Sequence, residues 1–275
     1  MSNLTGYNVM NETTVPGIMK YKHKKKLAMV TAYDYSMARL LDQCDIDIML
    51  VGDSLGMVSL GHEDTLSVDM EEMLHHTRAV SRGTRRALVV ADMPFMSYQT
   101  SVGTALFNAG RFLKEARAGA VKIEGGTSVV PQVKAMVEAG IPVMGHLGLT
   151  PQSIAKFGGF KVQGRGASGS IILSQAAELE DAGCFSLVLE AVPPALAEEV
   201  TKNINIPTIG IGAGPSCDGQ VLVINDLLGM NEEFTPRFVK KYADLSGIIT
   251  KAVSAYAGEV RTGVFPGPEH CYKDD

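Results

Sequence analysis

The sequence of 275 residues contains no tryptophan and only four cysteines. Cys44, Cys184, Cys217 and Cys271 form no Cys-x-x-Cys pair, so neither a zinc knuckle nor a disulfide framework is predicted. No apolar run is long enough to span a membrane, and the first 20 residues lack the apolar core of a signal peptide. We therefore expect a cytoplasmic protein with reduced thiols.

Positive charge is also scarce, with 25 lysine and arginine residues against 30 acidic ones and a formal net charge of −5. This balance argues against general nucleic-acid binding, because a phosphate backbone requires a basic surface. The one basic cluster, Lys20 to Lys26, is predicted to be a solvated helix end. Hydrophobic residues make up 45% of the chain, enough for an ordinary folded core.

Short apolar runs without polar alternation recur along the chain, as is typical of strands buried on both faces of a parallel sheet. The expected strands are Leu27–Ala32, Ile48–Val51, Ala87–Ala91, Ala120–Ile123, Ile141–Gly145, Phe185–Leu189, Ile206–Gly210 and Val221–Ile224. The segments with helical spacing are Tyr35–Gln43, Met70–Arg82, Thr104–Ala118, Val129–Ala139, Ser170–Ala182 and Pro194–Asn203. Eight alternating strands predict an α/β fold, a closed (β/α)8 TIM barrel, and an open doubly wound sheet is the alternative.

Three segments depart from this regular alternation. Residues 211–220 are too short for a full helix between the last two strands, and the chain from Phe234 to Ala257 is expected to form the eighth helix. The Gly-rich segment 147–169 is too long for a simple loop, so we expect its residues 150–169 to be a mobile cover over the barrel. In it, Lys161 and Arg165 are candidates to meet an anionic ligand.

Titratable side chains follow the expected strands where a barrel carries its active site, at the carboxyl ends. They are Asp53 with Ser54, Asp92, Lys122 with Glu124, His146 and Glu190. Taken singly, each has an ordinary structural explanation, such as a helix N-cap. Four carboxylates gathered at one mouth are costly unless a cation compensates them.

A hard divalent cation suits this set of side chains. Mg²⁺ prefers carboxylates, waters and substrate oxygens, whereas zinc or a redox metal would call for cysteine or several histidines. Such an ion polarises a ketone and stabilises an enolate, while one carboxylate outside the metal site acts as the base. The turn Gly210–Gly214 is either a phosphate-binding turn or a tight turn at the barrel mouth.

Eight motifs, in order from about Tyr21 to His270, resemble the ketopantoate hydroxymethyltransferase family. They read "TAYDYSMARLLD", "MLVGDSLGMVSLGHEDTL", "VVADMPFMSY", "VKIEGG", "GHLGLTPQS", "GGFKVQGRG", "LVLEAVP" and "IGIGAGPSCDGQVLVINDLLG". The resemblance implies a TIM barrel of the phosphoenolpyruvate/pyruvate type. It also implies transfer of a hydroxymethyl group from 5,10-methylenetetrahydrofolate to 3-methyl-2-oxobutanoate, giving ketopantoate for pantothenate and coenzyme A.

The resemblance also implies residue roles. Asp53 and Asp92 would ligate Mg²⁺, with Glu124 in the metal site through a water, and Glu190 would be the catalytic base. The substrate would contact Asp53, Ser54, Asp92, Lys122 and His146. Members of the family are typically homodecamers of two pentameric rings. Residues 1–18 lie outside the resemblance and are expected to be a flexible arm, with residues 19–275 forming one barrel domain with a C-terminal helix.

Two other functions are compatible with the same residues. One is a magnesium-dependent lyase or mutase of the same barrel superfamily, which would not depend on folate. The other is a non-catalytic barrel that only binds a 2-oxo acid. A site for binding alone has no need of an unligated base such as Glu190, which argues against the second alternative.

Overall fold

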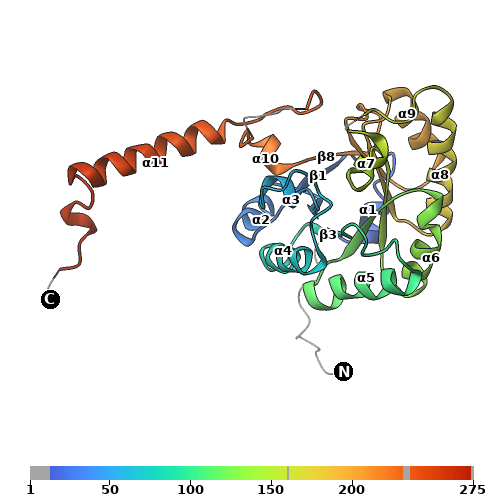
Figure 1. The fold of residues 1–275 in the computed structure, drawn as a ribbon, viewed down its shortest axis with the longest axis horizontal. Coiled ribbons are helices and arrows are strands. Elements are labelled where there is room, and N and C mark those ends of the chain that lie inside the picture. The colour runs from blue at the N-terminus through green and yellow to red at the C-terminus, as the bar shows by residue number, and fades with distance from the viewer. Residues whose placement is uncertain (1–12, 160, 232–235, 274–275) are drawn as a thin grey trace. The chain divides into compact units, whose positions relative to one another are not determined.

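The computed structural model describes residues 13–159, 161–231 and 236–273. Eight parallel strands close into a barrel in sequence order, with β8 paired to β1 (Figure 1). The strands are β1 Leu27–Thr31, β2 Ile48–Val51, β3 Leu88–Asp92, β4 Ala120–Glu124, β5 Val143–Gly148, β6 Ser186–Glu190, β7 Thr208–Ile211 and β8 Gly219–Leu222. The prediction of a TIM barrel is confirmed, and the open sheet is wrong.

Helices cover the outside of this barrel, as Figure 1 shows. The longer ones are α2 Tyr35–Leu41, α4 Met70–Gly83, α5 Val102–Ala116, α6 Val130–Glu138, α8 Gly169–Asp181 and α9 Pro194–Asn203. Each packs against the next around the barrel. Shorter helices are α1 Val15–Met19, α3 Leu55–Val58, α7 Ile154–Phe157 and the 3-10 turns η1 Thr127–Val129, η2 Pro151–Ser153 and η3 Gly166–Ser168. No helix lies between β7 and β8, as predicted for residues 211–220.

Capping side chains decide where the helices begin. In α4, Asp69 and Glu72 form a reciprocal capping box. In α5, the Ser101 hydroxyl accepts from the Thr104 amide, so the helix begins at Val102 rather than at the predicted Thr104. Helix α9 has the predicted bounds.

Proline shifts the beginning of two strands. Strands β5 and β7 start at Val143 and Thr208, two residues later than predicted. Pro142 and Pro207 precede them, and a proline has no amide hydrogen to donate to a neighbouring strand. Because β5 extends to Gly148, His146 lies inside the strand rather than at its end.

The barrel interior is an apolar cluster to which all eight strands contribute. Leu27, Ile48, Val90 and Ile209 belong to it, and so does the completely buried Ile18 of α1. The expected boundary between arm and barrel, after residue 18, therefore falls within a helix that packs into the core. Residues 1–12 of the expected arm lie outside the described residues.

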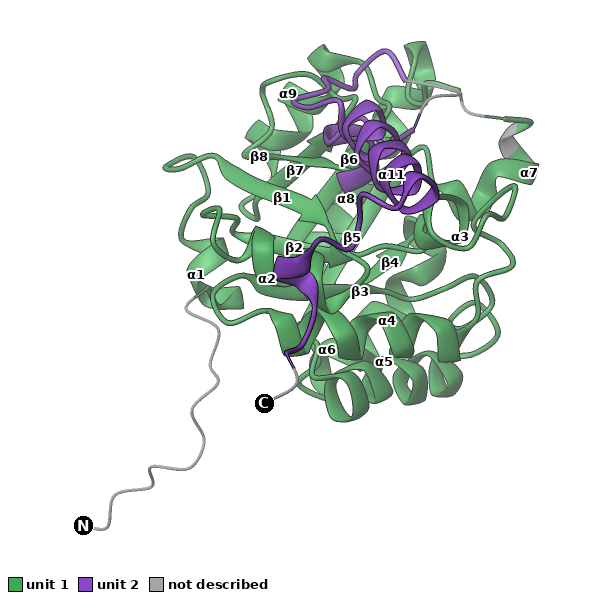
Figure 2. Cartoon of the chain, turned by 90° about the vertical axis from the view of Figure 1, so that its left-hand side faces the viewer, with its two compact units in different colours: residues 1–223 green, residues 224–275 purple. Residues whose placement is uncertain are grey.

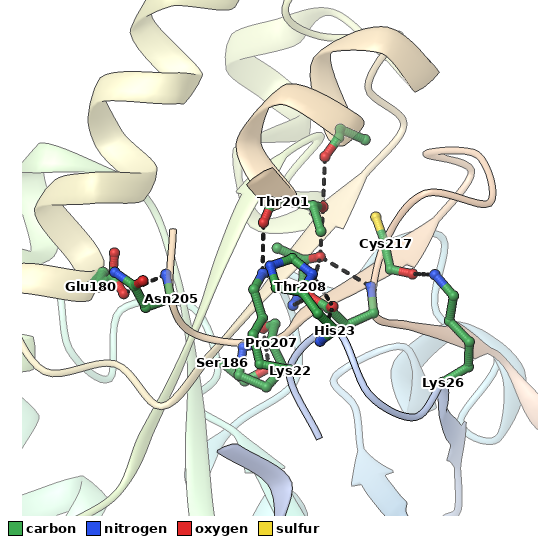
Figure 3. A network of polar contacts seen from close by, with 12 residues as sticks. Lys22, His23, Lys26, Glu180, Ser186, Thr201, Asn205, Pro207, Thr208 and Cys217 are labelled. Carbon is green, nitrogen blue, oxygen red and sulfur yellow. Dashed lines mark hydrogen bonds and ion pairs between the residues drawn. The ribbon is translucent and has the colours of Figure 1, made fainter. Parts of the chain in front are cut away.

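A polar network joins β1, β7 and β8 at their amino-terminal ends (Figure 3). Asp218 Oδ2 lies 2.9 Å from Lys22 Nζ and accepts from the Thr208 amide at 2.9 Å. Lys22 also donates to the Thr201 carbonyl oxygen at 2.7 Å. Most of the basic cluster is exposed just after α1, as predicted for a solvated helix end. The Lys22 side chain differs, because it is largely buried and contacts Asp218 between β7 and β8.

Residues 224–275 form a second compact unit, coloured purple in Figure 2. It contains α10 Ile224–Leu227, α11 Leu245–Thr262 and the turn η4 Pro268–His270. Helix α11 begins eleven residues after the predicted Phe234, because Asp244 caps it through the Gly247 amide. Residues 232–235 of the predicted helix lie outside the described residues. In the described parts of the chain, no helix is both long and apolar enough to cross a membrane.

Candidate active site

The titratable residues expected at the barrel mouth come together from five consecutive strands. Asp53 and Ser54 follow β2, and Asp92 and Glu190 end β3 and β6. The remaining three, Lys122, Glu124 and His146, lie within β4 and β5. All except Ser54 and Glu190 are buried.

Close ion pairs connect these side chains into a chain of charges. Lys122 Nζ lies 2.7 Å from Asp92 Oδ1 and 3.6 Å from Glu124 Oε1. His146 lies between two carboxylates, with Nδ1 at 3.2 Å from Glu124 Oε1 and Nε2 at 3.3 Å from Glu190 Oε2. The site therefore has two ends, Asp92 and Glu190, joined through Lys122, Glu124 and His146.

Asp53 lies beside Asp92, and Ser54 is held by a tyrosine. The Asp53 amide donates to Asp92 Oδ2 at 3.1 Å. The Ser54 hydroxyl lies 2.9 Å from the Tyr33 hydroxyl, which follows β1. The carboxylates of Asp53, Asp92 and Glu124 thus come from three neighbouring strands and face the same small region.

The pKa shifts of the side chains differ between the two ends of the site. Burial, then the charges of Asp92 and Glu124, raise the pKa of Asp53 well above its ordinary value. Burial and Lys122 lower the pKa of His146, but Glu124 and Glu190 outweigh them and raise it to about 9. Burial acts against the charge of Glu124, yet His146 and Lys122 lower its pKa. Burial and the neighbouring negative charges therefore both disfavour ionisation of Asp53.

A divalent cation would offset the negative charge of the carboxylates around Asp53. Residues 13–159, 161–231 and 236–273 contain no group of three or more acidic, histidine or cysteine side chains already arranged around a metal. Their donors nevertheless suit one, because Asp53 and Asp92 are buried carboxylates whose residues lie in hydrogen-bond contact. Asp92 Oδ1 also lacks a hydrogen bond of suitable geometry, although it pairs with Lys122. This oxygen-rich, negatively charged set fits Mg²⁺ better than zinc.

Sequence reasoning missed Gln152 and Tyr98, two buried neutral residues of the site. Gln152 lies in η2, directly after β5, and its Nε2 donates to Asp53 Oδ2 at 2.8 Å. The Tyr98 hydroxyl donates to Gln152 Oε1 at 2.7 Å. The only signal in the sequence was the place of Gln152 just after a strand end, because a neutral amide is not a usual metal ligand or base.

The segment after β5 begins inside the site and then passes over its rim. Gln152 is buried, whereas Lys161 and Arg165 are exposed. Further along, the Gln163 amide donates at 2.9 Å to the carbonyl oxygen of Ala191, the residue after Glu190. The predicted cover over residues 150–169 therefore runs beside Glu190, but Phe160 lies outside the described residues and its motion stays a prediction.

The turn after β7 is tightly packed. Gly214 has φ +82°, and a Cβ there would lie 2.8 Å from Pro194 Cβ. A side chain at this position would strain the backbone and clash with α9, which explains the glycine without a ligand. Phosphate binding at Gly210–Gly214 stays a prediction.

Known proteins of one family match this chain along nearly its whole length. Residues 12–268 match the family described as ketopantoate hydroxymethyltransferase. The 3-methyl-2-oxobutanoate hydroxymethyltransferase of Syntrophobacter fumaroxidans is 64% identical over 261 residues, 94% of this chain and 93% of the relative. The protein of that name from Enterococcus faecalis is 59% identical, over 96% of each chain.

Solved structures resemble the barrel at much lower identity. A phosphonopyruvate hydrolase in complex with oxalate and Mg²⁺ superposes with a TM-score of 0.62 at 11% identity, over 96% of this chain and 92% of that one. A 2,3-dimethylmalate lyase of the phosphoenolpyruvate mutase/isocitrate lyase superfamily gives 0.61 at 14%, over 95% and 89%. These similarities show the fold.

Proposed function

Because the chain belongs to the ketopantoate hydroxymethyltransferase family, we propose that it makes 2-dehydropantoate (ketopantoate) from 3-methyl-2-oxobutanoate. The one-carbon unit comes from 5,10-methylenetetrahydrofolate, and water supplies the oxygen of the new hydroxymethyl group. The reaction serves pantothenate and coenzyme A biosynthesis. The observation that carries the proposal is the two-ended site, with paired acids Asp53 and Asp92 at one end and Glu190 at the other.

We assign Mg²⁺ to the acidic end. Asp53 and Asp92 would hold the ion, with Glu124 in the same site. When bound, Mg²⁺ polarises the ketone of the oxo acid and stabilises the enolate. Support comes from the three buried carboxylates, which carry more negative charge than Lys122 and a protonated His146 neutralise. Ser54, Lys122 and His146 lie where they can contact the carboxylate and ketone of the substrate.

Glu190 is the proposed base. Its carboxylate contacts His146, whereas the Asp92 carboxylate accepts from the Asp53 amide at the other end of the site. The side chain of Glu190 is 14% exposed, against 3% for that of His146, so it is accessible from the mouth. Protonated His146, held between Glu124 and Glu190, fixes the carboxylate that removes the C3 proton beside the ketone.

A coupled assay tests the proposed function. Product should form from 3-methyl-2-oxobutanoate only with both methylenetetrahydrofolate and Mg²⁺, and removal of Mg²⁺ with a chelator should abolish it reversibly. Turnover of the oxo acid without folate would instead favour a lyase or mutase, and binding without turnover would favour the non-catalytic barrel.

We also propose a homo-oligomer, a decamer by analogy with the family, located in the cytoplasm. Within the described chain no residue of α11 is buried, although the helix carries Ile248, Val253 and Tyr256. A neighbouring copy would cover this apolar stripe. The four free cysteines support a reducing compartment.

A further inference from the structure

The side chain of Gln152 uses its entire hydrogen-bonding capacity inside the site. Its Nε2 donates to Asp53 Oδ2 at 2.8 Å and to the Met93 carbonyl oxygen at 2.9 Å. Its Oε1 accepts from the Tyr98 hydroxyl at 2.7 Å and from Gln99 Nε2 at 3.3 Å. An amide has two donors and accepts two bonds, so no further partner can be added without losing one of these.

These partners determine which way the amide points. Turning it by half a rotation would place Oε1 against the Asp53 carboxylate and the Met93 carbonyl, both of which are acceptors. It would also direct the N–H groups at Gln99 Nε2, a donor. The Tyr98 hydroxyl could accept from a reversed amide, because it also lies 3.1 Å from the Glu124 carbonyl oxygen, so Asp53 and Met93 fix the orientation.

The same residue holds a second carboxylate through its backbone. The Gln152 amide donates to Glu124 Oε2 at 3.1 Å. Asp53 follows β2 and Glu124 ends β4, so one residue of η2 bridges acids on two different strands. Gln152 thus occupies Asp53 Oδ2 and Glu124 Oε2, while Glu124 Oε1 faces Lys122 and His146.

We propose that Gln152 is a positioning residue that orients Asp53 and Glu124 for Mg²⁺ and couples the segment after β5 to metal binding. The inference rests on the proposed function, because it takes these acids as the metal site. Groups that hydrogen-bond to metal ligands set ligand orientation, and their loss commonly lowers metal affinity. Coupling is reciprocal, so bound Mg²⁺ should stabilise the backbone around Gln152.

The test measures Mg²⁺ affinity of the full-length protein by calorimetry. Gln152→Leu has similar volume but no polar atoms, and should weaken Mg²⁺ binding about tenfold or more. Tyr98→Phe removes one of the two donors to Gln152 Oε1 and leaves both Nε2 bonds in place, so it should weaken Mg²⁺ binding less. Gln132→Leu is the matched control, because Gln132 donates only to the Tyr98 carbonyl oxygen, at 3.4 Å, and should leave affinity within about twofold.

Two further measurements separate positioning from general damage. The Mg²⁺ concentration for half-maximal activity should rise in Gln152→Leu in parallel with its Kd, while kcat at saturating Mg²⁺ recovers substantially. Amide exchange of residues 151–157 should slow when Mg²⁺ binds the wild-type protein, and this response should shrink in the variant.

The outcomes distinguish this inference from the function on which it rests. Failure of the wild-type protein to bind Mg²⁺ would remove the proposed metal site. Wild-type binding with unchanged affinity in Gln152→Leu would overturn the positioning role alone. If Gln152→Leu does not fold, the Mg²⁺ affinity of Tyr98→Phe is the test. An affinity of Tyr98→Phe equal to that of Gln132→Leu contradicts the inference.

Discussion

Glu190 and His146 form the end of the site that lies apart from the acidic pair. If Glu190 removes the C3 proton, the enzyme with Mg²⁺ should exchange that proton of 3-methyl-2-oxobutanoate into D₂O, even without folate. Glu190→Gln keeps the shape of the side chain but cannot accept a proton at neutral pH. We expect the exchange rate, followed by proton NMR, to fall by about a hundredfold or more, as for loss of a general base.

Magnesium binding is the internal control for this variant. Glu190 lies outside the proposed metal site, so Glu190→Gln should bind Mg²⁺ with nearly wild-type affinity. Near-normal proton exchange by the folded variant would move the base elsewhere, and His146 is the next candidate because it contacts the same carboxylate at 3.3 Å.

Residue chemistry explains which parts of the site could be predicted. Asp53, Asp92, Lys122, Glu124, His146 and Glu190 are titratable and lie at or near strand ends, so the barrel rule alone gathers them at one mouth. Gln152 and Tyr98 are neutral, and their part in the site depends on contacts across 99 and 26 residues of sequence. Sequence pattern does not encode such contacts.

At the scale of elements, Asp218 stabilises the closure between β7, β8 and β1. Burial raises its pKa, but hydrogen bonds from Lys22 and two backbone amides outweigh it and hold the pKa below the ordinary value. A depressed carboxylate pKa stabilises the fold above the unfolded pKa, and this contribution is lost as pH falls through the folded pKa. Asp218→Asn should therefore lower the free energy of unfolding at pH 7 by about 3 kcal/mol.

Urea unfolding at fixed protein concentration measures the free energy of unfolding, and so checks the size of the predicted change and the direction of its pH dependence. The difference between wild type and Asp218→Asn should be constant from pH 7 to about pH 5, and should shrink as pH falls further. Asp45→Asn is the control, because Asp45 is largely exposed and its ion pair with Arg86 is long, at 3.6 Å. A difference that grows on acidification would contradict this account.

The segment after β5 carries the second prediction at this scale. If residues 150–169 close over the mouth, substrate and Mg²⁺ should protect them from proteolysis. Trypsin can cut at Lys156, Lys161 and Arg165, which are all exposed. Cleavage in this segment should slow several-fold with bound oxo acid and Mg²⁺, with cleavage at the exposed Lys24 unchanged as the reference. Equal rates with and without ligand would argue against a closing cover.

Element boundaries could be predicted where one local signal dominates. The capping box of α4 and the proline at the start of α9 place those helices within one residue. Short helices such as α1 and α3 have too few residues for a periodic pattern, and α1 is held by the burial of Ile18 in the core. The beginning of α11 depended on choosing Asp244 among several polar residues before it.

At the scale of the whole molecule, alternation of buried strands and amphipathic helices was sufficient to predict a closed barrel. The division after Val223 was not predicted, because composition does not change there. In α11 the apolar positions Ile248, Ile249, Val253, Tyr256 and Val260 recur at helical spacing, yet all are exposed.

If a neighbouring copy covers this stripe, light scattering at micromolar concentration should give a multiple of the 29.3 kDa chain mass. Val253→Glu places a charge in the stripe and should lower the measured mass. Lys251→Glu changes charge on the opposite side of the helix and should not. A monomeric wild-type protein would refute the oligomer, and equal masses for the two variants would place the interface elsewhere.

The strands that carry charge to the mouth form one continuous arc, β2 to β6, while β7, β8 and β1 meet at the Asp218 network on the opposite end. The charged side chains of the mouth and the contacts that close the barrel therefore belong to different strands. Ile211, at the end of β7, packs on the core and pairs in register with Glu190 of β6. Variation there, for example Ile211→Val, keeps this backbone pairing, so C3 proton exchange should continue at an undiminished rate.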